Sequence, residues 1–237
     1  MGAGPRYWAV VPAAGIGQRM AAATPAGLPK QYLPLLEHTV IEWALQPLLA
    51  ADWIEAVVVA LAADDPHFSQ LPSAEHPKLR STTGGASRAE SVLAALRSLP
   101  ADAAQDWVLV HDAARPCLHA QDLQALRDQA SSDDGGLLAT PVADTLKRAA
   151  GRQVITTVPR DDLWRALTPQ MFRVAQLQAA LAEALRSGAE ITDDASAIEL
   201  AGGRPLLVAA EYENPKLTWP QDLAQIRRLL QRRQQQD

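Results

Sequence analysis

Apolar, β-branched runs alternate along the chain with stretches in which apolar residues recur at helical spacing. The runs predict strands over residues 7–11, 54–61, 107–110 and 136–140. The helical stretches predict helices over residues 39–51, 87–99 and 121–130. Strands that alternate with helices form parallel sheets covered on both sides. The pattern therefore predicts an α/β fold: a mostly parallel twisted sheet with helices on both faces.

Local signals mark where helices begin. The stretch from Ser87 to Glu90 matches a capping box, and residues 192–194 supply an N-cap and an acidic first turn for a further helix. Pro47 lies inside the predicted helix over residues 39–51. Because a proline lacks the N–H group and its ring meets the preceding turn, we expect a kink or an early stop there.

Residues 141–167 interrupt the alternation of strands and helices. Two strand-like stretches, 142–148 and 153–160, flank a glycine turn at Gly151, which predicts a protruding hairpin. An isolated hairpin is marginally stable in water, so we expect it to pack against a second copy of the chain. We therefore predict one domain over residues 1–237 and a homodimer, with residues 141–162 as its dimerisation β-arm.

Composition narrows the class of protein. The chain has 237 residues, 48% of them hydrophobic, which suits one large α/β domain. The net charge of -5, without a long basic block, gives no indication of nucleic-acid binding. The single cysteine, Cys117, cannot form an internal disulfide, and the first apolar run ends at Pro12, too short for a membrane span. We expect a cytoplasmic protein that does not bind membranes.

The first strand leads into a loop rich in small residues, 12–20, that suits a phosphate group. Small residues let main-chain amides approach an anion, and Arg19 and Lys30 add positive charge. A Rossmann dinucleotide loop is not favoured, because Met20 stands where its third glycine would be. A Walker loop is not favoured either, because the chain has no Lys-Ser or Lys-Thr pair. The alternative is an ordinary turn between strand and helix.

Other polar clusters follow predicted strands. Residues 84–91 join a strand to a helix N-terminus, which presents amides to a ligand, although a well-capped helix would look the same. Residues 111–116 place Asp112 and Arg115 at the carboxyl end of a strand, where open α/β sheets bind ligands. The alternative there is a structural ion pair between these two side chains.

Two further clusters suit phosphate esters. Residues 167–170, considered together with Thr145 and Arg160 on the arm, provide hydroxyls and a guanidinium. Lys216 precedes the last predicted helix, and its alternative role is that of a solvated surface lysine. We assign no role to the isolated residues His38, His67, His76 and His119.

Several motifs, in order from about Ala9 to Thr218, resemble those of bacterial 2-C-methyl-D-erythritol 4-phosphate cytidylyltransferases of the nonmevalonate isoprenoid pathway. They are residues 12–20, 29–32, 111–116, 166–170 and 191–197. The resemblance implies a Rossmann-like fold and a reaction in which CTP and methylerythritol phosphate give CDP-methylerythritol and pyrophosphate. It also implies Mg²⁺, held mainly through the CTP phosphates, with Asp112 as a candidate ligand.

The resemblance further implies roles for individual residues. Arg19 and Lys30 would stabilise charge on the CTP phosphates, while Lys216 and Arg160 would position the attacking phosphate, with Thr145 and Arg160 reaching the neighbouring subunit's site. The implied nucleotide-binding residues are Pro12, Ala13, Ala14, Gly15, Gly17, Gly85, Ala86 and Ser91. The implied substrate-binding residues are Asp112, Arg115, Thr145, Thr168 and Thr192.

The chain departs from the family pattern in two places. Residues 21–28 form a longer link before Lys30, and Ala86 and Ser87 stand where many members carry acidic residues. Two alternatives remain open at this point. One is a cytidylyltransferase of the same build that accepts ribitol 5-phosphate, and the other is a non-catalytic nucleotide-binding module, since fold does not fix function.

Overall fold

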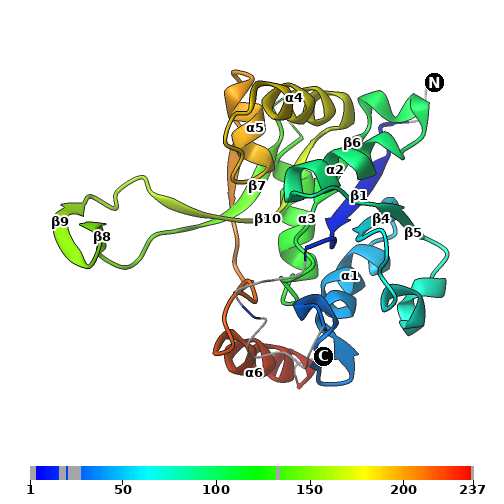
Figure 1. The fold of residues 1–237 in the computed structure, drawn as a ribbon, viewed down its shortest axis with the longest axis horizontal. Helices are drawn as coiled ribbons and strands as arrows, with labels where there is room; N and C mark the ends of the chain where they lie inside the picture. The colour runs from blue at the N-terminus through cyan, green and yellow to red at the C-terminus, as the bar shows by residue number, and fades with distance from the viewer. Residues whose placement is uncertain (1–3, 16–19, 21–27, 132–133, 236–237) are drawn as a thin grey trace.

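A seven-stranded sheet forms the centre of the molecule in the computed structural model, which describes residues 4–15, 20, 28–131 and 134–235 (Figure 1). In spatial order the strands are β11 (Leu206–Ala209), β7 (Gly136–Pro141), β10 (Trp164–Arg173), β6 (Trp107–Val110), β1 (Tyr7–Pro12), β4 (Ile54–Leu61) and β5 (Leu79–Thr83). Among these described strands, only β10 runs antiparallel to its neighbours. The predicted mostly parallel sheet is therefore confirmed, and so are the four predicted strands.

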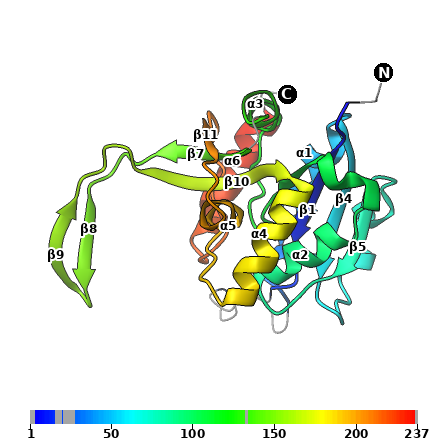
Figure 2. The ribbon, with the colours of Figure 1, turned by 90° about the horizontal axis from the view of Figure 1, so that it is seen from above.

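Helices cover both faces of this sheet (Figure 2). On one face lie α1 (Val40–Ala50) and α3 (Ala120–Gln129), and on the other lie α2 (Arg88–Arg97), α4 (Val174–Ser187) and α5 (Asp194–Leu200). Successive side chains of β1 point to opposite faces: Trp8 and Val10 pack with α2 and α4, whereas Ala9 and Val11 pack with α1 and α3. The continuous apolar runs in the sequence reflect this burial on both sides.

A third apolar cluster joins the two ends of the chain. Helix α6 (Asp222–Gln234) buries Ile226 and Leu230 against Val40 and Trp43. The short strands β2 (Pro34–Leu35) and β3 (His38–Thr39) precede α1, and single helical turns cover Lys30–Tyr32, Phe68–Gln70, Pro72–Glu75 and Ala101–Gln105. This cluster brings the segment with Lys30 next to the segment that precedes α6.

The capping signals are confirmed, whereas the early stop at Pro47 is wrong. Ser87 caps α2 in a capping box with Glu90, and Asp193 caps α5. Helix α1 continues past Pro47 to Ala50. The reason is tertiary packing, because α1 is buried against two apolar clusters, through Leu45 on one side and Trp43 on the other.

The predicted hairpin is present and projects from the body (Figures 1 and 2). Strands β8 (Leu146–Ala150) and β9 (Gln153–Val158) pair antiparallel, and Gly151 adopts a positive φ of 57° in the turn. The arm extends the antiparallel pair of β7 and β10. Most of its side chains are exposed, including the apolar residues Val154 and Ile155, both 63% exposed.

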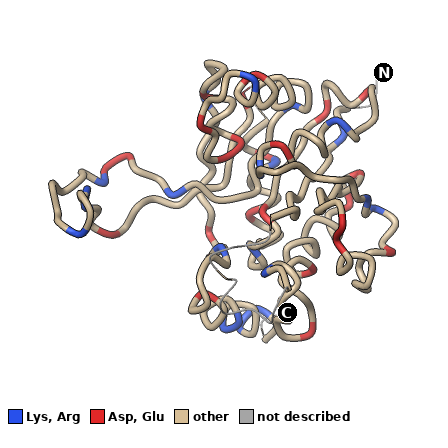
Figure 3. Tube along the Cα trace, viewed as in Figure 1, with Lys and Arg blue, Asp and Glu red and all other residues tan. Residues whose placement is uncertain are grey.

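Acidic and basic residues are interspersed over the body in the view of Figure 3, and several basic residues lie on the arm. Within the described part of the chain, no helix combines the length and apolar character needed to cross a membrane.

Candidate functional site

Two adjoining pockets lie where strands β1 and β6 end. Pocket A, of about 240 Å³, is lined by the loops after β1, β5 and β6 and by two lysines from other segments. Its lining residues are Pro12, Ala13, Ala14, Gly15, Lys30, Gln31, Gly85, Ala86, Ser87, Arg88, Ser91, Asp112, Ala113, Ala114 and Lys216. The position agrees with the general rule that open α/β sheets bind ligands at the carboxyl ends of their strands.

Pocket B, of about 260 Å³, lies beside pocket A and is lined by residues from the loop after β6, from β10 and from the segment just before α5, together with Arg88 and Lys216. Its lining residues are Arg88, Asp112, Arg115, Ala166, Leu167, Thr168, Gln170, Thr192, Asp193 and Lys216. Arg88, Asp112 and Lys216 line both pockets. The two pockets therefore meet at a cluster of charged side chains.

The walls of pocket A are two loops packed closely against each other. A Cβ added at Gly84 would lie 2.8 Å from the Ala14 Cβ, and one added at Gly85 would lie 2.3 Å from the Glu90 Cβ. Glycine is therefore required at both positions. The buried Gln31 side chain donates to the carbonyl of Ala13 at 2.8 Å, which fixes the first loop.

The Ser91 side chain holds the Gly85 loop in place from inside the protein. Its hydroxyl accepts the Gly85 N–H at 3.1 Å and lies 2.8 Å from the Ser87 carbonyl, to which it donates. The side chain is buried. The surface that the Gly85 loop presents to pocket A is therefore mainly main chain.

Lys30 and Lys216 come from distant parts of the sequence and reach the same pocket. The Lys30 ammonium donates to the Leu217 carbonyl at 2.6 Å. Because Leu217 directly follows Lys216 in the sequence, this bond holds the Lys30 side chain beside the segment that carries Lys216. Lys216 Nζ lies 2.7 Å from Asp112 Oδ2. The Leu217 N–H donates to the Ala114 carbonyl at 2.8 Å, which holds this segment on the loop that follows β6.

Asp112 is paired with three cations at the junction of the pockets. Its Oδ1 atom accepts from Arg88 Nε at 2.9 Å, and its Oδ2 atom lies 2.7 Å from Lys216 and 3.5 Å from Arg115 Nε. Burial alone would raise the pKa of Asp112, but the positive charges of Arg88, Lys216 and Arg115 outweigh it and hold this pKa well below its usual range. The expected ion pair with Arg115 exists, but it is the longest of three contacts.

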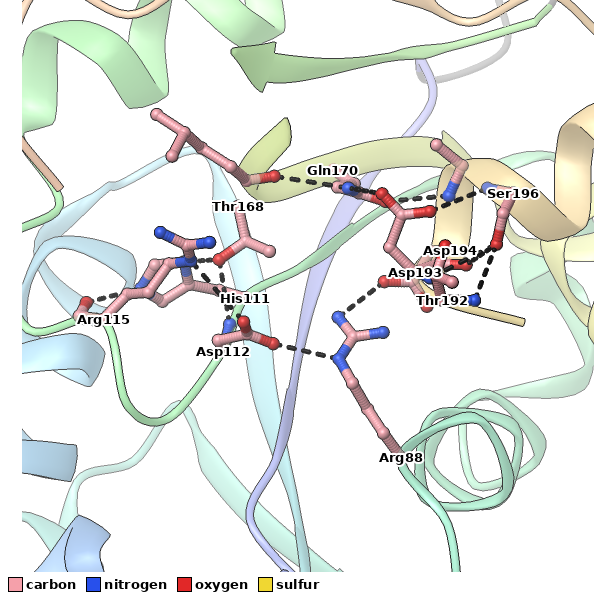
Figure 4. A network of polar contacts seen from close by, with 12 residues as sticks. Arg88, His111, Asp112, Arg115, Thr168, Gln170, Thr192, Asp193, Asp194 and Ser196 are labelled. Atoms are coloured by element: carbon pink, nitrogen blue, oxygen red, sulfur yellow. Dashed lines mark hydrogen bonds and ion pairs between the residues drawn. The ribbon is translucent and has the colours of Figure 1, made fainter. Parts of the chain in front are cut away.

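His111 and Thr168 form hydrogen bonds that hold the main chain around Asp112 in place (Figure 4). His111 Nε2 lies 3.0 Å from the Arg115 carbonyl, so it carries the proton and donates. Nδ1 then accepts from the Thr168 hydroxyl at 3.0 Å, and the same hydroxyl accepts the Asp112 N–H at 3.1 Å. Burial lowers the pKa of His111 to about 4, so the ring is neutral near pH 7 and does not line either pocket as a base.

Pocket B is closed on one side by a link between β10 and α5. The buried Gln170 amide donates to Asp193 Oδ2 at 2.8 Å and accepts the Ala195 N–H at 2.8 Å. The Thr192 N–H donates to the Ser196 hydroxyl at 3.1 Å. Figure 4 shows these contacts together with Arg88, which lies between Asp112 and Asp194.

Most residues singled out in the sequence line these two pockets. Pro12, Ala13, Ala14, Gly15, Lys30, Gly85, Ala86, Ser91, Asp112 and Lys216 line pocket A, and Asp112, Arg115, Thr168, Thr192 and Lys216 line pocket B. Gly17 and Arg19 lie outside the described residues. The expected cluster of Thr168 with Thr145 and Arg160 does not form within one chain, since the arm carries the latter two away from the body (Figure 1).

Sequence reasoning missed three residues at this site, namely Gln31, Arg88 and Asp194. Arg88 had a detectable signal: it is the first residue of α2, and a cation at a helix N-terminus opposes the helix dipole. Acidic partners elsewhere in the fold would offset that unfavourable interaction. Gln31 and Asp194 gave no signal of this kind, because their partners are distant along the chain.

The donor set suits a metal ion that arrives with a phosphate ligand. Among the residues that the structure describes, no group of three or more His, Cys, Asp or Glu side chains could hold a metal. Asp112 is the one carboxylate among the described residues that line pocket A. Mg²⁺ is commonly held by one or two carboxylates together with substrate phosphates, and a single carboxylate fits that arrangement.

Comparison with known proteins identifies one family. A sequence model of the family 2-C-methyl-D-erythritol 4-phosphate cytidylyltransferase matches residues 7–232. The protein of that name from Vibrio vulnificus strain CMCP6 is 51% identical over 219 residues, which is 91% of each chain. The one from Tolumonas auensis is 50% identical over 230 residues, covering 96% of this chain and 98% of its own.

Solved structures agree with these sequence matches. A crystal structure of 4-diphosphocytidyl-2C-methyl-D-erythritol synthase superposes with a TM-score of 0.82 at 39% identity, covering 95% of this chain and 99% of its own. The cytidylyltransferase from Thermus thermophilus superposes with a TM-score of 0.78 at 31% identity, covering 95% of this chain and 99% of its own. The similarity therefore extends over nearly the whole chain.

Proposed function

The chain belongs to the 2-C-methyl-D-erythritol 4-phosphate cytidylyltransferase family, and on that premise we propose that it transfers the cytidylyl group of CTP to 2-C-methyl-D-erythritol 4-phosphate. The products are CDP-methylerythritol and pyrophosphate. One observation carries the proposal for this chain: two pockets meet at Asp112 and Lys216, with Lys30 in the first and Arg115 in the second. Two anions that repel each other can be held together there.

Pocket A is the site that we assign to CTP. The main chain of residues 12–15 and of Gly85 and Ala86 borders cytosine and ribose. Lys30 is directed to the triphosphate, and Arg19 is its proposed partner from the sequence. Cations placed where charge develops in the transition state are the main source of catalysis in such phosphoryl-type transfers.

Pocket B is the site that we assign to methylerythritol phosphate. Arg115 and Lys216 supply charge for its phosphate, and Thr192 and Thr168 border the sugar chain. Because the Thr168 hydroxyl donates to His111 and accepts the Asp112 N–H, only its second lone pair is left for a substrate hydroxyl. Asp112 orients Lys216 between the pockets.

The reaction needs no general base from the protein. A phosphate monoester carries about 1.5 to 2 negative charges near pH 7, so one of its oxygens attacks the α-phosphorus of CTP directly. The new O–Pα bond forms as the bond from Pα to the bridging oxygen of pyrophosphate breaks. The neutral, enclosed His111 and the ionised Asp112 agree with a mechanism of positioning and charge stabilisation.

Mg²⁺ is proposed as the divalent metal, held mainly by the CTP phosphates, with Asp112 as the candidate protein ligand. Bound there, it supplies charge neutralisation on the triphosphate. The residues of pocket A then orient the nucleotide that carries it.

We also propose a homodimer in which each arm, residues 141–162, completes the partner's site with Thr145 and Arg160. The exposed Val154 and Ile155 on the arm support this, because apolar side chains on a projecting hairpin are expected to be covered. We place the enzyme in the cytoplasm, because its single free cysteine, Cys117, suits a reducing compartment.

The test is to incubate the purified protein with Mg²⁺, CTP and a panel of polyol phosphates, and to follow pyrophosphate release. Methylerythritol phosphate is expected to give the highest kcat/KM. A preference for ribitol 5-phosphate would indicate a ribitol-5-phosphate cytidylyltransferase instead. If no acceptor leads to release of pyrophosphate, a non-catalytic nucleotide-binding protein would be favoured. UTP serves as the control nucleotide for base selectivity.

A further inference from the structure

We propose that Arg88 is a positioning residue for the transfer reaction, held in place by the buried carboxylate of Asp194. This inference rests on the proposed function. Arg88 lines both pockets, and its guanidinium joins two carboxylates from different elements (Figure 4). Its Nε donates to Asp112 Oδ1 at 2.9 Å, and its Nη2 donates to Asp194 Oδ2 at 2.7 Å.

Asp194 has the properties of a residue that acts through Arg88. Its side chain is 0% exposed, and its Oδ1 atom has no hydrogen-bond partner among the described residues. Burial raises the pKa of Asp194, and Arg88 opposes that rise. A carboxylate in such surroundings is costly unless a cation pairs with it. Arg88 provides that cation, and Asp194 in return fixes one end of the guanidinium.

The position of Arg88 is not explained by the helix that carries it. As the first residue of α2, its charge lies at the positive end of the helix dipole. The two carboxylates must therefore stabilise it there. A planar guanidinium can bind both at once through separate N–H groups, which a lysine ammonium on a flexible chain would not do in the same fixed geometry.

At the junction of the pockets, Arg88 keeps Asp112 oriented and neutralised. It occupies Oδ1, so that Oδ2 faces Lys216. When Lys216 turns to a substrate phosphate, Asp112 would otherwise keep only its longer contact with Arg115, at 3.5 Å, beside two polyanions. Arg88 removes that repulsion and prevents the carboxylate from rotating into the path between the substrates.

The experiment compares Arg88→Met, Asp194→Asn and the double variant, each assayed below its own melting temperature. We expect Arg88→Met to lower kcat/KM by about 100-fold, in the range seen for one lost charge-stabilising donor. We expect Asp194→Asn to lower it by about 10-fold, because the guanidinium stays but loses its anchor. KM should rise for both substrates, since Arg88 borders both pockets.

The double variant separates positioning from stability. Arg88→Met leaves Asp194 buried without a counter-ion, whereas the double variant removes both members of the pair and should regain thermal stability. If Arg88 is a positioning residue, activity stays low despite that recovery. If kcat/KM returns to the wild-type value together with stability, Arg88 is only structural and the inference is wrong.

Arg6 offers a matched control. Arg6 Nε pairs with Asp106 Oδ2 at 2.8 Å, and the exposures of 35% and 9% resemble the 28% and 8% of Arg88 and Asp112. Arg6→Met should lose stability but keep kcat/KM, because Arg6 lines neither pocket. Failure of wild type to release pyrophosphate would refute the proposed function, whereas an active wild type with an equally active Arg88→Met would refute this inference alone.

Discussion

Lys30 is fixed by a main-chain carbonyl in the lining of pocket A, the pocket proposed to bind CTP. Lys30→Gln should lower kcat by about 10²–10³-fold, because it removes a cation that acts mainly in the transition state. KM for CTP should change much less. Steady-state kinetics with varied CTP measure both values. Arg19→Ala is expected to behave in the same way on grounds of sequence.

Lys78 is the natural control for Lys30. Its ammonium also donates to a main-chain carbonyl, that of Ala51 at 2.9 Å, but it lines neither pocket. Lys78→Gln should therefore keep wild-type kinetics. Near-normal turnover of Lys30→Gln would remove Lys30 from the mechanism.

His111 should make the stability of the fold depend on pH. Burial lowers its pKa from 6.5 to about 4, so the unfolded chain binds more protons than the folded chain between these values. The stability that neutral His111 contributes is thus complete above pH 6.5 and is lost as the pH falls toward 4. A shift of this size corresponds to a loss on the order of 3 kcal/mol.

Urea unfolding at a series of pH values measures this contribution. His111→Gln should lose less stability than wild type over the same fall in pH, because its side chain does not titrate. Other groups titrate in both proteins and cancel in the comparison. Parallel curves for wild type and His111→Gln would contradict the prediction.

At the scale of single elements, α1 shows that a local capping signal sets where a helix begins, whereas tertiary packing sets where it ends. Its capping box at Thr39 fixes the start: Glu42 N donates to Thr39 Oγ1 at 3.4 Å, and Thr39 N donates to Glu42 Oε2 at 2.9 Å. Its end is decided by packing, since burial of the helix against two apolar clusters carries it past Pro47.

Thr39→Ala should lower the free energy of unfolding by about 1 kcal/mol, because one N-terminal N–H of α1 loses its side-chain acceptor. Denaturant unfolding measures the change, and Thr39→Ser, which keeps the hydroxyl, should stay close to wild type. Catalytic activity should be unaffected, since Thr39 lines neither pocket. Equal stability of the Ala and Ser variants would show that the cap contributes nothing.

At the scale of the whole molecule, the arm and the body are separate parts of one chain. Arg160 lies on the exposed arm and donates to the Ala143 carbonyl there, whereas Lys216 lies at the junction of the pockets. If each arm completes the partner's site, the two residues act together only across a dimer.

Mixing two inactive variants tests that arrangement. In a mixed dimer of Arg160→Ala with Lys216→Ala, one site receives an intact body and an intact arm from different chains. With random exchange in a twofold dimer, about a quarter of wild-type activity should return. Pyrophosphate release by the mixture, against each variant alone, is the measurement. No recovery after demonstrated exchange would argue against the shared site.

Deleting residues 143–157 tests the dimer itself. The shortened chain should be monomeric by light scattering, because the exposed apolar side chains of the arm are lost. A dimer that persists without these residues would place the interface elsewhere.

The sequence alone determined many of the elements and the edge of the sheet that carries the site. Apolar periodicity and capping residues are local properties, so the β1, β4, β6 and β7 strands and the starts of α2 and α5 followed from them. The loops after β1 and β6 could be placed together because parallel strands present their carboxyl ends at one edge. Strand β10 was not predicted, because Pro169 interrupts its sequence pattern. Its pairing with β7 also shifts register, between Ala166 and Gln170, which only the folded sheet shows.

Only the tertiary structure decided which charges meet. Arg88, Asp112, Asp194 and Lys216 come from four segments, and nothing in their local sequence states the distances between them. The same holds for Gln31, whose partner lies on another loop. Such contacts depend on how chain segments cross in space, whereas strands and helices depend on neighbours along the chain. The positions of helices and strands therefore follow from local sequence. The arrangement of charges that joins the two pockets is set only when the chain folds.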